Sequence, residues 1–199
     1  MLALLFVATL AAQNAPPIAP PAPAATSPQT APAKTMSNPV VTIKTSMGSI
    51  DVELFPDKAP KSVENFLGYV KAAHYDNTVF HRVIAGFMIQ GGGFDKQMNK
   101  KSSRAAVVNE AGNGLKNDTG TIAMARTSDP DSATSQFYIN AKDNQALNRS
   151  EGNPGYTVFG KVVGGLDVVK KIEASQTSTQ SGMKDVPVTA VLIESVRLK

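Results

Sequence analysis

Apolar and polar residues alternate in short runs along most of the chain, and this is the pattern of half-buried β-strands. The segment VVTIKTSMGSIDVELF, which begins at Val40, predicts two strands joined at Met47 and Gly48. Further runs of the same kind are TVFHRVI, GTIAMA, SQFYIN, YTVFGKVV and TAVLIESVRL. Many short strands separated by turn residues predict a mainly β protein, a closed antiparallel barrel with helices packed on it.

Two segments have helical spacing instead. The first follows Pro60, a residue that fits the first turn of a helix. Apolar residues recur there every three or four positions, and again in LDVVKKIEA near the end of the chain. They are Val63, Phe66, Leu67 and Val70 in the first segment and Leu166, Val169 and Ile172 in the second. Residues 91–120, rich in glycine and polar residues, predict a long loop, and loops of that length are often functional.

The first 38 residues differ in composition from the rest. Residues 1–12, MLALLFVATLAA, are apolar but fewer than the roughly 20 needed to span a bilayer, so they resemble the hydrophobic part of a secretory signal. No basic residue precedes this run. Residues 13–38 contain seven of the 13 prolines and predict an extended tether, leaving 39–199 as the folded domain. We therefore expect export to the periplasm, with tethering through an uncut signal as the alternative.

The composition argues against several classes of catalytic and binding site. The chain has no cysteine and only two histidines, His74 and His81, which argues against thiol catalysis, disulfides and multi-histidine metal sites. The net charge is +4, and the most basic run, residues 96–104, contains no aromatic residue on which bases could stack. Nucleic-acid binding is not expected. Ser135 lies in no G-x-S-x-G elbow, and GGLD at 164–167 lacks the ending of a phosphate-binding loop.

Three blocks carry a specific resemblance. They are FHRVIAGFMIQGG at 80–92, GTIAMARTSDPDSATSQFYIN at 120–140 and GYTVFGKVVGGLDVV at 155–169. In this order they resemble the cyclophilin-type peptidyl-prolyl cis/trans isomerases, and the exported bacterial branch in particular. The likeness runs from about Val40 to Lys199. It implies a closed eight-stranded antiparallel barrel capped by two α-helices, which agrees with the pattern of strands and helices.

The resemblance also implies a site. It places a groove on the outside of the barrel, with Arg82 and Gln90 as catalytic residues, and this accounts for an arginine inside so apolar a block. Substrate-binding positions are Phe87, Met88, Tyr138 and Leu147 around the proline ring, Ala125 and Arg126 along the residues before proline, and Gln136 and Tyr156 at the border of the groove. Many relatives have Asn where this chain has Arg126, so only a main-chain role is carried over. His81 matches a family residue that we interpret as structural.

Arginine suits the isomerisation of X-Pro bonds because it is always charged and has a planar fork of donors. The expected function is therefore isomerisation of X-Pro bonds in unfolded or partly folded client proteins, with no metal and no cofactor. A non-catalytic proline-binding chaperone module is the alternative, and the presence of both Arg82 and Gln90 favours the enzyme. Ala146 stands where many eukaryotic members have Trp, so we expect weak cyclosporin binding. A monomer is expected, since nothing indicates a large exposed apolar patch.

Overall fold

The computed structural model describes residues 38–199. The predictions for residues 1–12 and for the tether, apart from its last residue, lie outside the described residues. Within the described part, no helix has the length and apolar character needed to cross a membrane.

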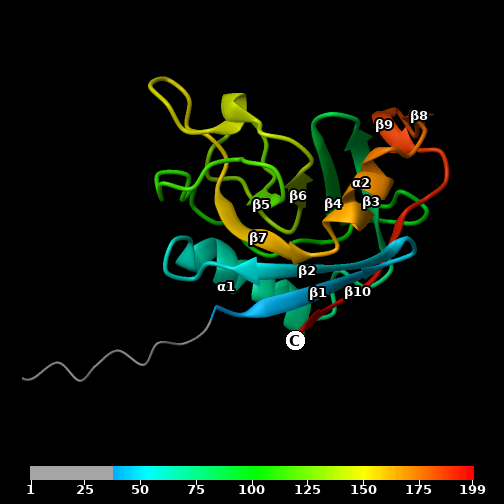
Figure 1. Ribbon diagram of the computed structural model, residues 1–199, viewed down its shortest axis with the longest axis horizontal. Coiled ribbons are helices and arrows are strands. Elements are labelled where there is room, and N and C mark those ends of the chain that lie inside the picture. The colour runs from blue at the N-terminus through cyan, green and yellow to red at the C-terminus, as the bar shows by residue number, and fades with distance from the viewer. Residues whose placement is uncertain (1–37) are drawn as a thin grey trace, which may run out of the picture. The chain divides into compact units, whose positions relative to one another are not determined.

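Eight strands of this part close into an antiparallel barrel, as the sequence predicts (Figure 1). Around the barrel their order is β1-β10-β3-β4-β6-β5-β7-β2. The strands are β1 Val40–Thr45, β2 Gly48–Leu54, β3 Thr78–Ile84, β4 Met88–Asp95, β5 Thr121–Met124, β6 Phe137–Asn140, β7 Val158–Gly164 and β10 Leu192–Leu198. A short 3-10 helix covers Gln145–Leu147.

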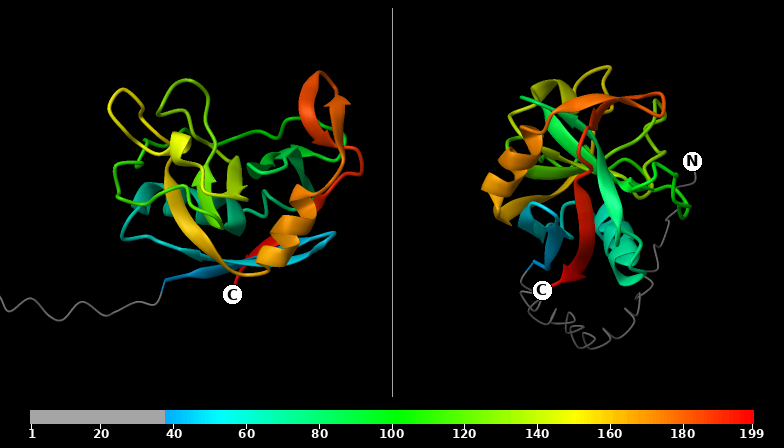
Figure 2. Two further views of the ribbon diagram at one scale, coloured as in Figure 1. Left: turned by 45° about the horizontal axis from the view of Figure 1, so that its top comes forward. Right: turned by 90° about the vertical axis from the view of Figure 1, so that its right-hand side faces the viewer.

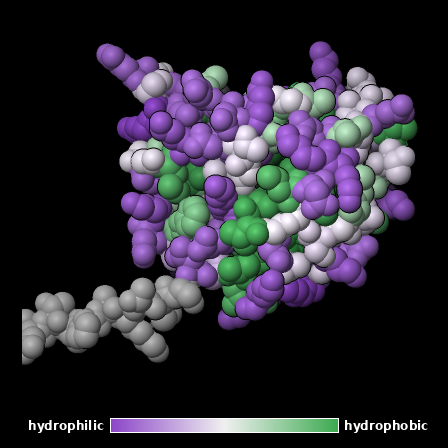
Figure 3. All heavy atoms as spheres, viewed as in Figure 1, coloured by the Kyte–Doolittle hydropathy of each residue, from purple (hydrophilic) through white to green (hydrophobic). Residues whose placement is uncertain are grey.

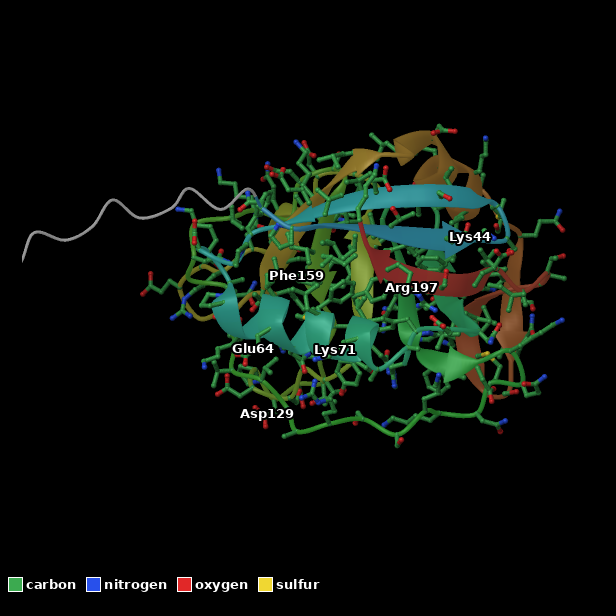
Figure 4. All side chains as sticks on the ribbon, turned by 90° about the horizontal axis from the view of Figure 1, so that it is seen from below. Lys44, Glu64, Lys71, Asp129, Phe159 and Arg197 are labelled. Atoms are coloured by element: carbon green, nitrogen blue, oxygen red, sulfur yellow. The ribbon has the colours of Figure 1, made fainter. Side chains whose placement is uncertain are left out.

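Two α-helices, α1 (Pro60–Lys71) and α2 (Leu166–Glu173), lie on opposite sides of the barrel (Figure 2). Most of their apolar residues join the same buried cluster as the inward-facing residues of the strands, whereas Leu166, expected on the apolar side of α2, is 41% exposed. Phe66 of α1 packs its ring 5.7 Å from Phe137 and 5.2 Å from Phe159. Figure 4 shows Phe159 above α1, with Glu64 and Lys71 on the far side of the helix. Both predicted helices are confirmed.

The prediction for the segment after Gln90 was partly wrong. Gly91 to Asp95, expected to begin a loop, continue strand β4. Glycine is needed here because aromatic rings crowd the backbone: a Cβ at Gly92, where φ is +84°, would lie 2.9 Å from the ring of Tyr75. A glycine-rich sequence is usually a weak strand, but in this barrel it leaves room for the core.

A second difference is a hairpin that the sequence pattern did not reveal. It consists of β8 (Thr177–Gln180) and β9 (Met183–Pro187), which pair with each other outside the barrel. β8 is mostly exposed and has no apolar residue, so it lacks the alternation that marks a half-buried strand. The hairpin packs beside β3 (Figure 1). In the view of Figure 3, apolar residues occupy separate areas among mostly polar ones.

Candidate active site

The candidate site is built on the outer face of the barrel by strand register. Arg82 of β3 pairs with Gln90 of β4, Gln90 pairs with Tyr138 of β6, and Tyr138 pairs with Ala123 of β5. Paired residues point to the same face of a sheet, so these side chains form one row across four strands. The neighbouring residues in sequence, such as Val83 and Ile89, face the barrel interior instead. Arg82 is accordingly the one exposed residue of β3.

A second, smaller apolar cluster lies along this row, separate from the barrel core. Its buried members are Met88, Ala123, Tyr138 and Val158, with Ile84, Phe87, Leu115, Ala125, Leu147 and Tyr156 packed partly buried around them. A hollow of about 220 Å³ opens on this cluster. It is lined by Arg82, Phe87, Met88, Gln90, Ala125, Arg126, Tyr138, Leu147 and Tyr156. Nine of the ten site residues predicted from the sequence thus meet around one hollow.

Gln136 is the tenth predicted residue, and the structure places it beside the hollow instead of in its lining. Its side-chain oxygen accepts a hydrogen bond of 2.9 Å from Nε2 of Gln90. Gln136 lines a neighbouring hollow of about 400 Å³, together with His81, Arg82, Phe94 and residues 183–185. Arg82 therefore lies between the two hollows. Gln136 contacts the lining of the 220 Å³ hollow through its hydrogen bond with Gln90.

Phe87 is held in place by contacts from distant parts of the chain. It follows a turn in which Gly86 has a φ of +66°, a conformation that favours glycine. Glu173 at the end of α2 accepts a hydrogen bond of 2.6 Å from the Gly86 amide. The Phe87 carbonyl in turn accepts hydrogen bonds from the Ala141 amide at 3.0 Å and from Nδ2 of Asn144 at 2.8 Å.

Two tyrosines and Arg126 form another part of the lining. The rings of Tyr138 and Tyr156 meet edge to face with centroids 5.9 Å apart. The guanidinium of Arg126 lies 4.2 Å from the centre of the Tyr156 ring and donates from Nε and Nη2 to the Gly155 carbonyl. These contacts hold the side chain of Arg126 against the wall. The amide of Ala125 is paired with the carbonyl of Gln136 at 3.0 Å.

Asn117 is a supporting residue that the sequence analysis missed. It lies in the long loop and accepts a hydrogen bond of 2.7 Å from the Tyr138 hydroxyl, while its Nδ2 donates to the Leu147 carbonyl at 3.1 Å. It therefore links two walls of the hollow. Burial raises the pKa of Tyr138 well above its usual value, so this hydroxyl stays a neutral donor. The only signal in the sequence was the predicted functional role of the loop.

His81 is adjacent to Arg82 in sequence and lines the same 400 Å³ hollow, but it is almost fully buried. Burial lowers its pKa to about 4, so the ring is neutral at physiological pH. Its Nδ1 has no hydrogen-bond partner within residues 38–199. The ring packs 4.6 Å from that of Phe94. A buried, neutral ring fits the structural role that we expected for His81.

Comparisons with known proteins identify the family. The family model described as "Cyclophilin type peptidyl-prolyl cis-trans isomerase/CLD" matches residues 40–198. The chain belongs to the cyclophilin-type peptidyl-prolyl cis-trans isomerases. The family resemblance seen in the sequence is confirmed, and the protein is a peptidyl-prolyl cis-trans isomerase.

Relatives of this cyclophilin-type isomerase are similar over nearly their whole length. A peptidyl-prolyl cis-trans isomerase of Acinetobacter baylyi is 53% identical over 167 residues, which cover 84% of this chain and 89% of that protein. Peptidyl-prolyl cis-trans isomerase B of Escherichia coli is 52% identical over 160 residues, covering 79% and 98%. A cyclophilin-type isomerase of Cryptosporidium parvum, crystallised in the presence of the dipeptide ala-pro, has a TM-score of 0.69 at 30% identity, covering 80% of this chain and 98% of that one.

Proposed function

We propose that this isomerase accelerates X-Pro rotation in unfolded or partly folded proteins, and that Arg82 does so by stabilising the twisted imide. The C–N bond of a peptide has partial double-bond character, with a rotational barrier of about 18–20 kcal/mol. In the twisted state this resonance is lost, and the proline nitrogen becomes pyramidal with a free lone pair. A donor aimed at that lone pair binds the twisted form far better than the planar one, so it lowers the barrier.

The observation that carries the proposal is the position of Arg82 at the edge of an apolar hollow. Its side chain is 44% exposed, and it lines the same cavity as the rings of Phe87, Tyr138 and Tyr156. A proline ring has no donor of its own and suits such walls. Arginine keeps its charge at all relevant pH values and offers a planar fork of donors, so no proton has to be transferred.

The remaining lining residues anchor one side of the bond while the other side rotates. In this proposal Met88 and Leu147 complete the proline pocket, and Gln90 contacts a substrate carbonyl. The backbone at Ala125 and Arg126 lies along the residues that precede proline. The relative crystallised with ala-pro supports a proline-containing peptide as the ligand class. The clients of this chain would be proline-containing segments of unfolded proteins.

The test compares wild type with Arg82→Ala by exchange NMR on an X-Pro peptide. Loss of a donor that acts mainly in the transition state lowers catalysis by about 10²- to 10³-fold, so we expect kcat/KM to fall on that scale while the peptide Kd changes by less than about threefold. Arg104→Ala is the matched control, because Arg104 lies over Tyr69 of α1 and not in the hollow. Full activity in Arg82→Ala would contradict the arginine mechanism.

The folding role has a separate test. A client whose refolding is limited by prolyl isomerisation should regain its structure faster with wild type than with Arg82→Ala. If both proteins act equally, the groove serves as a holding site, which is the chaperone alternative.

We also propose that the protein is exported. Support comes from the apolar segment at 1–12 and the proline-rich segment after it. N-terminal sequencing of the protein recovered from the periplasm should find it cut after the apolar segment. Recovery of the uncut chain from the membrane would favour tethering instead.

A further inference from the structure

One contact of Arg82 comes from outside the barrel. Asp185 of β9 forms an ion pair with Arg82 in which Oδ2 lies 3.6 Å from Nε. The hairpin that carries Asp185 is separated from β3 by about half the chain and packs against it in the fold. We infer that Asp185 is a positioning residue: it holds the Arg82 guanidinium in one orientation at the edge of the proline groove. The inference rests on the proposed role of Arg82 in the reaction.

Arg82 needs such a restraint because it has open space on two sides. It lines both the 220 Å³ hollow and the 400 Å³ hollow, so its long side chain has room to turn toward either one. Lysine and arginine side chains carry large rotamer entropy, and an unrestrained guanidinium would spend much of its time away from the groove. Asp185 lines the second hollow and is the residue there with the opposite charge. A carboxylate at this place narrows the range of arginine rotamers.

The geometry suits orientation without occupying the donors. A separation of 3.6 Å is too long for a hydrogen bond, so the attraction is Coulombic. The ion pair engages Nε, the nitrogen nearest the side-chain stem, and leaves the two terminal nitrogens outside the pair. Nothing in this contact has to break before the arginine can donate to an imide.

The backbone at Asp185 is a second, independent observation. Its φ is +62°, in the left-handed region that favours glycine. Asp and Asn tolerate this conformation better than other residues, but glycine adopts it with less strain. Strained non-glycine residues cluster at functional sites. Here a carboxylate occupies a position where glycine would serve the backbone better, and that carboxylate faces Arg82.

The test separates the effect of the Asp185 charge from the effect of its backbone conformation. Asp185→Asn keeps the size and the tolerance of a positive φ but removes the charge, and Asp185→Gly relieves the strain while removing the whole side chain. Exposed ion pairs are weak, so we expect both variants to lower kcat/KM by about three- to fivefold, mainly through kcat. Asp185→Gly should be at least as resistant to urea as wild type. Glu194→Gln is the control, because it breaks the comparably exposed ion pair with Lys44, and neither residue lines either hollow.

A direct readout is the mobility of the Arg82 Nε–H group measured by NMR relaxation. Its order parameter should fall in Asp185→Asn and Asp185→Gly and stay unchanged in Glu194→Gln. In an Arg82→Ala background, Asp185→Asn should have no further effect on kcat/KM. A purely structural role for Asp185 would instead make activity follow stability, with Asp185→Gly fully active.

The outcomes for the two proposals are distinct. If Arg82→Ala keeps full activity, both the arginine mechanism and this inference are wrong. If Arg82→Ala loses activity but both Asp185 variants stay within about 1.5-fold of wild type with an unchanged order parameter, the positioning role alone is overturned.

Discussion

Replacing His81 with phenylalanine removes a buried titratable group from β3. In the folded protein burial lowers the pKa of His81 to about 4, from an ordinary value of 6.5. The unfolded chain therefore takes up a proton in a pH range in which the folded protein does not. The contribution of His81 to folding stability is greatest above pH 6.5 and falls as the pH drops from 6.5 to 4. Below pH 4 this group causes no further loss.

The size of the loss in folding free energy follows from the two pKa values of His81. Their difference of about 2.5 units corresponds to about 3 kcal/mol once both states are protonated, at about 1.36 kcal/mol per unit. At pH 5 the linkage relation gives a loss of about 2 kcal/mol relative to pH 8. Burial also lowers the pKa of His74, the other histidine, so it adds a loss of its own in the same direction.

Urea unfolding at pH 8 and pH 5 measures this effect, and the lowered pKa values of Asp51 and Asp76 place the effects of these two carboxylates at lower pH. Wild type should lose at least about 2 kcal/mol between the two pH values. His81→Phe should lose about 2 kcal/mol less than wild type does. A double variant that also carries His74→Phe has no histidine, and its stability should be nearly flat over this range.

The refuting result is specific. If His81→Phe loses as much stability as wild type between pH 8 and pH 5, the ring is not held neutral by burial. The activity profile is a companion measurement: kcat/KM of wild type should not change between pH 6 and pH 9, because the proposed mechanism transfers no proton. A step within this range would mean that a titrating group takes part.

Three further outcomes are expected. Gly160→Ala should lower the free energy of unfolding by about 2 kcal/mol in a urea titration, because a Cβ there would clash with the Glu53 carbonyl oxygen inside the barrel wall. Tyr138→Phe should cost about 1 kcal/mol of stability by removing the hydrogen bond to Asn117, yet keep kcat/KM within about threefold since the ring remains as a pocket wall. Cyclosporin should bind with a micromolar or weaker Kd by calorimetry because Ala146 supplies no indole; nanomolar affinity would show that the prediction is wrong.

The local pattern of apolar and polar residues was enough to predict most strands of the barrel. TVFHRVI coincides with β3, and the apolar spacing after Pro60 coincides with α1, because alternation and helical periodicity report directly which residues are buried. The glycines after Gln90 were misread as a loop. The low strand propensity of glycine describes a backbone without tertiary contacts. In the folded protein this strand is stabilised by its neighbours, and it requires glycine to make room for Tyr75.

The three sequence blocks determined the family, and they contain every residue of the proposed site except Leu147. What they could not determine is how residues far apart in sequence meet. Strand register alone brings Gln90 between Arg82 and Tyr138, and the packing of the β8–β9 hairpin alone brings Asp185 to Arg82. Periodicity decides whether a side chain faces in or out, but hydrogen-bond pairing and barrel closure are non-local, so the neighbours of each outward residue exist only in the folded chain.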